Sequence, residues 1–241
     1  QLDTRTHGRQ KLGVVYLALP AVALHLLQAG LDISEGTLNL GIYKVASLIF
    51  VTMCVISLVT LIIRPLHILV IAIFPLSALA VLLNAFAPAT GGTMQGLPAG
   101  VILHVALALV AFGVLMLATL QAALVSLQTQ KLRHHQTKGI LQMLPPLDLM
   151  ESMFFELLAA GVLLLSVAMI TGAVFIQDLF GQQLVHKTVL TLIAWAIFTT
   201  TLTMHWLQGC RIGTAVTLVF SGFICLTIGF FGSKLVLELM L

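Results

Sequence analysis

The chain is a succession of long apolar stretches, separated by short segments that carry most of the charged residues. A transmembrane helix needs about 20 consecutive, mostly apolar residues to cross a hydrocarbon core about 30 Å thick. Since residues 65–130 contain no Asp, Glu, Lys or Arg, we divide that region at the segment 84–98, which is rich in Pro, Gly, Ala and Thr. The pattern then predicts seven spans, at about residues 12–31, 45–63, 66–86, 99–128, 157–177, 188–210 and 212–233.

Backbone polar groups in hydrocarbon must be satisfied within the protein, and these stretches are too long for barrel strands. We therefore expect an all-α, polytopic transmembrane bundle that forms one integral-membrane domain over residues 1–241. Composition agrees, because 60% of the residues are hydrophobic and only 8% are charged, whereas a soluble domain has about 25% charged residues. A net charge of +3, scattered along the chain, gives no indication of nucleic-acid binding.

The distribution of basic residues predicts the orientation in the membrane, because Lys and Arg collect on cytoplasmic loops. With the amino end inside, three basic residues fall outside, Lys44, Lys187 and Lys234, and the other eight fall inside. The predicted topology is N-in, C-out. Two connections are more than simple loops. Residues 139–153, with Pro145 and Pro146, are expected to form an interfacial segment before the fifth span, and the outside loop 31–41 could partly re-enter the membrane.

Histidines are the main ionisable residues within the predicted spans, where such residues are functional candidates by default. His25 and His104 each lie about five residues from the outer end of their span, roughly 7–8 Å deep at 1.5 Å per residue. At this common depth on two helices they could ligate one metal together. His205 lies near the inner end of the sixth span, on a helical face shared with Trp195. For each histidine, a structural hydrogen bond is the alternative to ligation.

The residues around His104 also allow two interpretations. Its helical face continues through a stripe of mostly small side chains: Ala108, Ala111, Leu115, Ala118 and Ala122. Small residues let membrane helices pack closely, but beside a histidine they could also leave room for a flat macrocycle. No carboxylate or thiolate lies at the depth of the two histidines, so zinc, which takes three or four protein ligands, is disfavoured. Two imidazoles among apolar neighbours fit haem better than a bare metal ion.

The chain resembles the cytochrome c assembly (CcsA/CcmC/ResC-like) membrane family, and most closely its short YpjD/HemX-type branch. The resemblance covers essentially the whole chain. It is carried by residues 97–105, 144–151, Gly161, Thr171, Gly172, 186–190, Ala194, Trp195, His205, 209–211 and 231–234. It implies haem handling, with His104 at the position of an external histidine and His205 at that of a transmembrane one. Members of this branch carry one more amino-terminal helix, so a further span before residue 1 is expected.

Two departures limit what the resemblance implies. Residues 176–187 stand where larger relatives have a tryptophan-rich loop, yet they contain no tryptophan, and the carboxyl end stops before the position at which the second external histidine is expected. Haem binding within the bundle is therefore expected rather than presentation to apocytochrome c.

Together these features predict a bacterial inner-membrane protein, not an enzyme, that binds haem non-covalently in haem handling or cytochrome c assembly. His25 and His104 would be the axial ligands and His205 a second haem contact. Trp195 would line the site, and Lys187 and Arg211 would pair with propionates. Other cytochrome-assembly or tetrapyrrole-synthesis proteins are expected partners. The alternatives are a regulatory or scaffolding protein without haem, with the basic segment 131–138 as its contact surface, and a transporter of another small apolar molecule.

Overall fold

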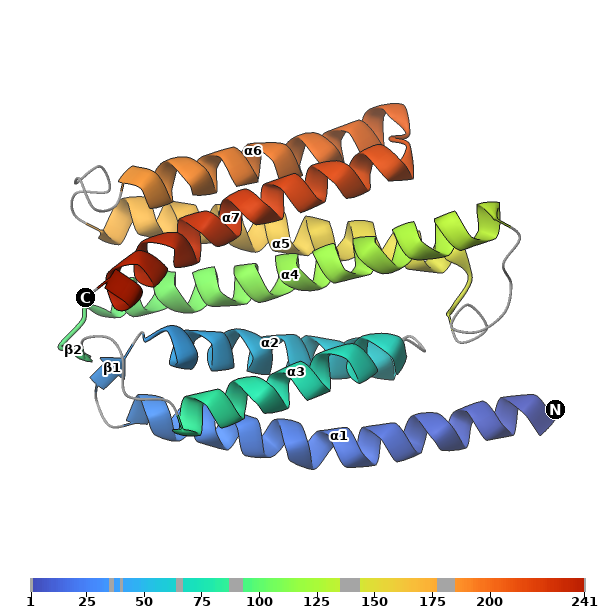
Figure 1. Cartoon of the computed structure of the whole chain (residues 1–241), viewed down its shortest axis with the longest axis horizontal. Helices are drawn as coiled ribbons and strands as arrows, with labels where there is room; N and C mark the ends of the chain where they lie inside the picture. The colour runs from blue at the N-terminus through green and yellow to red at the C-terminus, as the bar shows by residue number, and fades with distance from the viewer. Residues whose placement is uncertain are drawn as a thin grey trace. The chain divides into compact units, whose positions relative to one another are not determined.

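Seven long α-helices dominate the computed structural model, which describes residues 2–34, 37–39, 41–63, 67–86, 93–134, 144–176 and 185–240 (Figure 1). They are α1 (Leu2–Ser34), α2 (Ile42–Ile63), α3 (His67–Phe86), α4 (Ala99–Arg133), α5 (Leu147–Phe175), α6 (Val185–Gln208) and α7 (Ile212–Met240). Each contains a segment long and apolar enough to cross a membrane. The predicted all-α fold with seven spans is confirmed.

Among α4 to α7, the helix whose first residue differs most from the predicted span is α5. The helix begins at Leu147, whereas the apolar pattern placed the span at about residue 157. Pro146 is its N-cap, with φ −52° and ψ 142°, and Asp148 lies in the first turn. A proline at a helix start loses no intrahelical hydrogen bond, and an acidic side chain in the first turn interacts favourably with the helix dipole. Of the expected interfacial segment 139–153, residues 147–153 are therefore helical, and residues 139–143 lie outside the described residues.

Contacts divide the chain into two compact units. Unit 1 comprises Gln1–Gly96 with Met143–Pro145, and unit 2 comprises Leu97–Gln142 with Pro146–Leu241. The expectation of one integral-membrane domain stays a prediction.

Unit 1 contains α1, α2 and α3 and two short strands that the hydrophobic pattern did not predict. β1 (Thr37–Asn39) pairs antiparallel with β2 (Thr93–Gln95), and Leu38 stands opposite Met94. The loop 31–41 was expected to re-enter the membrane partly. In the described residues, α1 continues to Ser34 and residues 37–39 form the strand β1. Buried apolar side chains of α2 and α3 form the core, among them Val45, Met53, Leu61 and Ile73.

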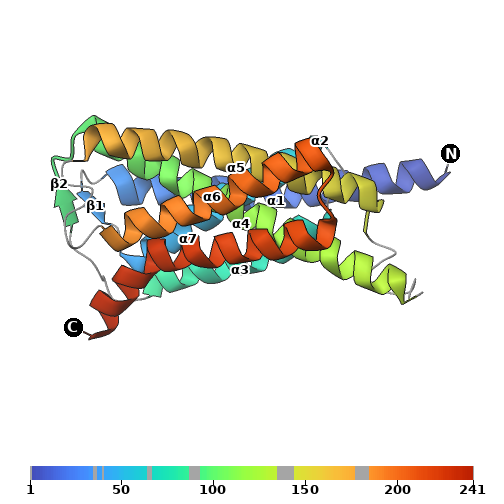
Figure 2. The ribbon, with the colours of Figure 1, turned by 90° about the horizontal axis from the view of Figure 1, so that it is seen from above.

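Unit 2 contains α4 to α7, of which α6 and α7 run side by side in both views (Figures 1 and 2). The small-residue stripe of α4 is buried here, since Ala111, Leu115, Ala118 and Ala122 are all 0% exposed. A Cβ atom added to Gly161 of α5 would lie 2.6 Å from Cδ2 of Leu115. The stripe therefore packs closely against α5, as the packing interpretation expected.

Candidate functional site

His104 lies in the second turn of α4 and reaches across to α5. Its Nδ1 atom lies 2.8 Å from the carbonyl oxygen of Ala168 and 3.5 Å from Oγ1 of Thr171. A carbonyl oxygen only accepts hydrogen bonds, so Nδ1 carries the proton in this contact. In the neutral ring Nε2 then keeps its lone pair, which is the arrangement found in metal-binding histidines, whose other nitrogen donates to a carbonyl or carboxylate.

His25 has a different environment within unit 1. The side chain is buried, its Nε2 lies 2.9 Å from Oγ of Ser47 on α2, and its Nδ1 lies 3.0 Å from Oγ of Ser77 on α3. These two hydrogen bonds join all three helices of the unit. To bind a metal, His25 would have to break its hydrogen bond to one of these two serine hydroxyls. His25 belongs to unit 1 and His104 to unit 2, and their pairing as axial ligands stays a prediction.

His205, on the last turns of α6, lies against α5. Its ring is stacked on that of Phe155, with 3.5 Å between the ring centroids and 11° between the planes. The carboxylate of Glu151, one turn before Phe155 on α5, interacts electrostatically with His205. No sequence signal identified Phe155 as the neighbour, because it depends on the packing of α5 against α6. Stacking covers one face of the imidazole, and the side chain as a whole is partly exposed.

The other candidates are spread along α6. Nε1 of Trp195 donates a hydrogen bond to Oγ of Ser166 on α5, at 2.8 Å. Lys187 is half-buried in the first turn of α6, and Arg211 is exposed after the helix ends. Within unit 2, α4 and α6 begin at the same end (Figure 1). Lys187 therefore lies at the end that carries His104, whereas Arg211 and His205 lie at the opposite end.

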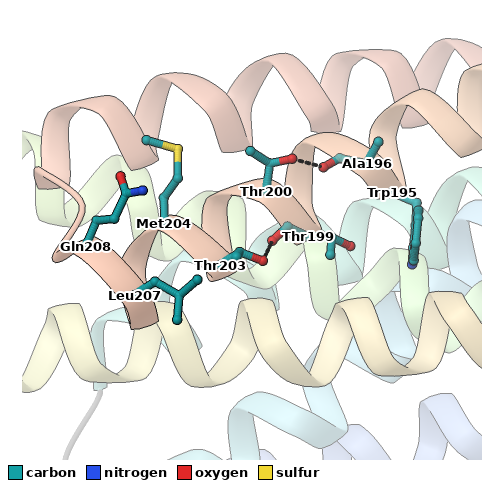
Figure 3. A pocket seen from close by; sticks show the side chains of 8 residues that line it. All are labelled: Trp195, Ala196, Thr199, Thr200, Thr203, Met204, Leu207 and Gln208. Carbon is teal, nitrogen blue, oxygen red and sulfur yellow. Dashed lines mark hydrogen bonds between the residues drawn. The ribbon is translucent and has the colours of Figure 1, made fainter.

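An open groove of about 310 Å³ runs along α6 (Figure 3). Its lining residues all come from this helix: Trp195, Ala196, Thr199, Thr200, Thr203, Met204, Leu207 and Gln208. Thr200 and Thr203 donate their hydroxyl protons to the carbonyl oxygens of Ala196 and Thr199, at 2.7 and 2.8 Å. None of these residues is a histidine, so the groove offers no imidazole to bind a metal.

Among the described residues, no group of three or more His, Cys, Asp or Glu side chains could hold a metal ion. The donor set therefore does not fit zinc, which takes three or four protein ligands. Within the described ranges of the chain, no hydrogen-bond partner is seen for Nε2 of His104. A single imidazole with such a nitrogen fits haem, because the porphyrin supplies the other nitrogen ligands. His135 and Lys138 of the basic segment 131–138, and residues 177–184 of the tryptophan-free loop, lie outside the described residues.

Comparison with known proteins gives a family but no solved structure. The inner membrane protein YpjD of Escherichia coli strain K12 is 25% identical over 235 residues, 97% of this chain and 89% of YpjD. An uncharacterized 28.8 kDa protein of Azospirillum brasilense, in the nifR3-like 5′ region, is 27% identical over 160 residues, 66% of this chain and 58% of that protein. No solved structure matches. The family model described as Cytochrome C assembly protein matches residues 14–241, and the chain therefore belongs to the cytochrome c assembly protein family.

Proposed function

We propose that this protein binds haem non-covalently, with Nε2 of His104 as an axial ligand, and that it handles haem for cytochrome c assembly in the bacterial inner membrane. Membership of the cytochrome c assembly protein family and the seven apolar helices support a haem-handling role in a membrane. The relative YpjD is named an inner membrane protein, which supports the location.

The observation that carries the proposal is the 2.8 Å contact between Nδ1 of His104 and the carbonyl oxygen of Ala168. It fixes the orientation of the ring and leaves Nε2 as a Lewis base. Haem, when bound, would supply an iron that can exchange its protein ligands, and His104 would hold it through Nε2. The protein would hold and release this group without making or breaking covalent bonds, so no catalytic residue is assigned.

The remaining candidates take supporting roles in the proposal. Lys187, at the same end of unit 2 as His104, would pair with a haem propionate, and Trp195 would line the site. At the opposite end, His205 would make a second haem contact during transfer, with Arg211 as its propionate partner. His25 would be the second axial ligand, provided that Ser47 or Ser77 releases its ring.

Absorption spectra of the full-length protein, gently purified and then oxidised and reduced, test the proposal. We expect a Soret band whose amplitude falls strongly in His104→Ala and is retained in Ala106→Leu, a change at an exposed position of the same helix. A purified protein without any Soret band after incubation with haem b would refute haem binding. Equal haem content in wild type and His104→Ala would refute the ligand assignment.

A further inference from the structure

The imidazole of His104 lies directly against the backbone of Gly172 on α5. A Cβ atom added to Gly172 would lie 2.8 Å from Cε1 of His104, 3.1 Å from Nδ1 and 3.6 Å from Nε2. A distance below 3.0 Å is shorter than real Cβ contacts allow. Any side chain at position 172 would therefore displace the ring, so the glycine determines where the imidazole can lie.

One hydrogen bond to the same turn of α5 fixes the ring further. Nδ1 of His104 donates to the carbonyl oxygen of Ala168, and Oγ1 of Thr171 donates to this same oxygen at 2.9 Å. Because the oxygen cannot donate, the neutral ring is held with its proton on Nδ1. The turn of α5 that makes space for the His104 ring at Gly172 thus also determines that Nε2 is the unprotonated nitrogen.

A reciprocal contact one turn earlier on α4 fixes the distance between the helices. A Cβ atom added to Gly100 would lie 2.3 Å from Cδ1 of Phe175, so this phenyl ring of α5 lies on the backbone of α4. Each helix thus accommodates an aromatic ring of the other at a glycine. The pair of contacts holds α4 and α5 in register where His104 meets Ala168.

We infer that residues 168–172 of α5 position His104 as a ligand: Gly172 makes room for the ring, and the Ala168 carbonyl holds it in the Nδ1-protonated tautomer with Nε2 free. Gly172 is therefore a positioning residue, which acts through His104. The importance for haem rests on the proposed function, but the ring geometry is a property of the haem-free protein and can be tested alone.

The first test is ¹⁵N NMR of histidine-labelled, haem-free protein in detergent at a pH where the ring is neutral. We expect the His104 signals, assigned by their loss in His104→Ala, to report a protonated Nδ1 and an unprotonated Nε2. Gly172→Ala should shift these signals. Gly161→Ala is the matched control, because its Cβ would overlap Leu115 of α4 by a similar amount, at 2.6 Å, far from His104. An Nε2-protonated wild-type ring, or signals that Gly172→Ala leaves unchanged, would overturn the inference.

Thermal unfolding covers the case in which Gly172→Ala folds poorly. Truncating His104 removes the atoms that the new Cβ would meet, so the double variant His104→Ala/Gly172→Ala should unfold at a higher temperature than Gly172→Ala alone. His104→Ala should not rescue Gly161→Ala. Equal rescue of both glycine variants, or of neither, would show that Gly172 does not act through His104.

Haem titration connects the positioning to function. Loss of an outer contact of a metal ligand lowers metal affinity about 10- to 100-fold, so we expect this loss for haem b in Gly172→Ala and no change in Gly161→Ala. Equal haem affinity in the two variants would contradict the role of Gly172 in haem binding. Absence of haem binding in the wild type, with the expected NMR result, would refute the proposed function while supporting the positioning of His104.

Discussion

Nδ1 of His104 lies 2.8 Å from the carbonyl oxygen of Ala168 and joins α4 to α5. By contrast, both ring nitrogens of His25 are hydrogen-bonded to serine hydroxyls. The two histidines are alike in the sequence, each about five residues from a predicted span end, but their side chains are not equivalent. His104 has one ring nitrogen, Nε2, with no hydrogen bond to the part of the chain that the structure describes, whereas His25 joins three helices.

Replacement of His25 distinguishes a ligand from a structural side chain. His25→Ala removes two buried hydrogen bonds and leaves a cavity. We therefore expect the free energy of unfolding to fall by about 2–3 kcal/mol. If His25 is also the second axial ligand, bound haem should change from a low-spin, bis-histidine spectrum to a high-spin one. Ser47→Ala keeps the imidazole and should keep the low-spin spectrum. A low-spin spectrum that persists in His25→Ala would contradict the axial pair and leave only the structural role.

The buried stripe of α4 predicts a steep dependence of stability on side-chain size. Ala118→Leu places a larger side chain at a position that is 0% exposed, and overpacking of this kind costs about 1–3 kcal/mol. The same change at the exposed position Ala106 should leave stability nearly unchanged. Thermal unfolding in detergent, followed by circular dichroism, measures both. Equal unfolding temperatures for the two variants would contradict the close packing of α4 on α5.

Lys187 and Arg211 lie at opposite ends of unit 2 and should therefore differ in their effect on haem held by His104. A partly exposed ion pair contributes about 1 kcal/mol or less, so Lys187→Gln should weaken haem b binding about two- to fivefold. The difference in haem b affinity between wild type and Lys187→Gln should shrink at high salt, because exposed charges are screened. Arg211→Gln should leave this affinity unchanged. Titrations of both variants at low and high salt give the comparison, and a larger loss for Arg211→Gln would reverse the assignment.

The stack of His205 on Phe155 allows its packing role to be separated from haem contact. His205→Phe preserves an aromatic ring against Phe155 and should keep the unfolding temperature, whereas His205→Ala should lower it. If His205 also contacts haem, both variants should release haem to an acceptor such as apomyoglobin at an altered rate. Unchanged release in His205→Phe would restrict His205 to packing.

Hydropathy identified all seven helices but not all of their limits. It measures how long a segment stays apolar, so it missed the first turns of α5, where Asp148, Glu151 and Glu156 interrupt the apolar pattern although the helix already begins at Leu147. The pairing of β1 with β2 was also missed, because each strand has three residues and the two are far apart in the sequence. Short segments carry too weak a periodicity to predict such a contact.

The candidate site was identified from the sequence by residue type, and the depth of its histidines in the membrane stays a prediction. Intramembrane histidines are rare enough to be noticed, and His104 was found in this way. Its tautomer was not predictable, because it depends on which α5 carbonyl lies opposite Nδ1. The role of Gly172 was equally hidden, although the residue was part of the family resemblance, since a glycine acquires its function here only from the ring that packs on it. Ser47 and Ser77 were also missed as partners of His25, because these hydrogen bonds depend on how α1, α2 and α3 pack together.

The most direct measurement is a titration of haem b into wild type and His104→Ala, followed at the Soret band and repeated with added imidazole. We expect tight binding to the wild type, a loss of about 10-fold or more when the axial ligand is removed, and recovery of the wild-type band when imidazole occupies the vacated position. Equal affinities in the two proteins, or a band that imidazole does not restore, would contradict the assignment of His104 as the axial ligand.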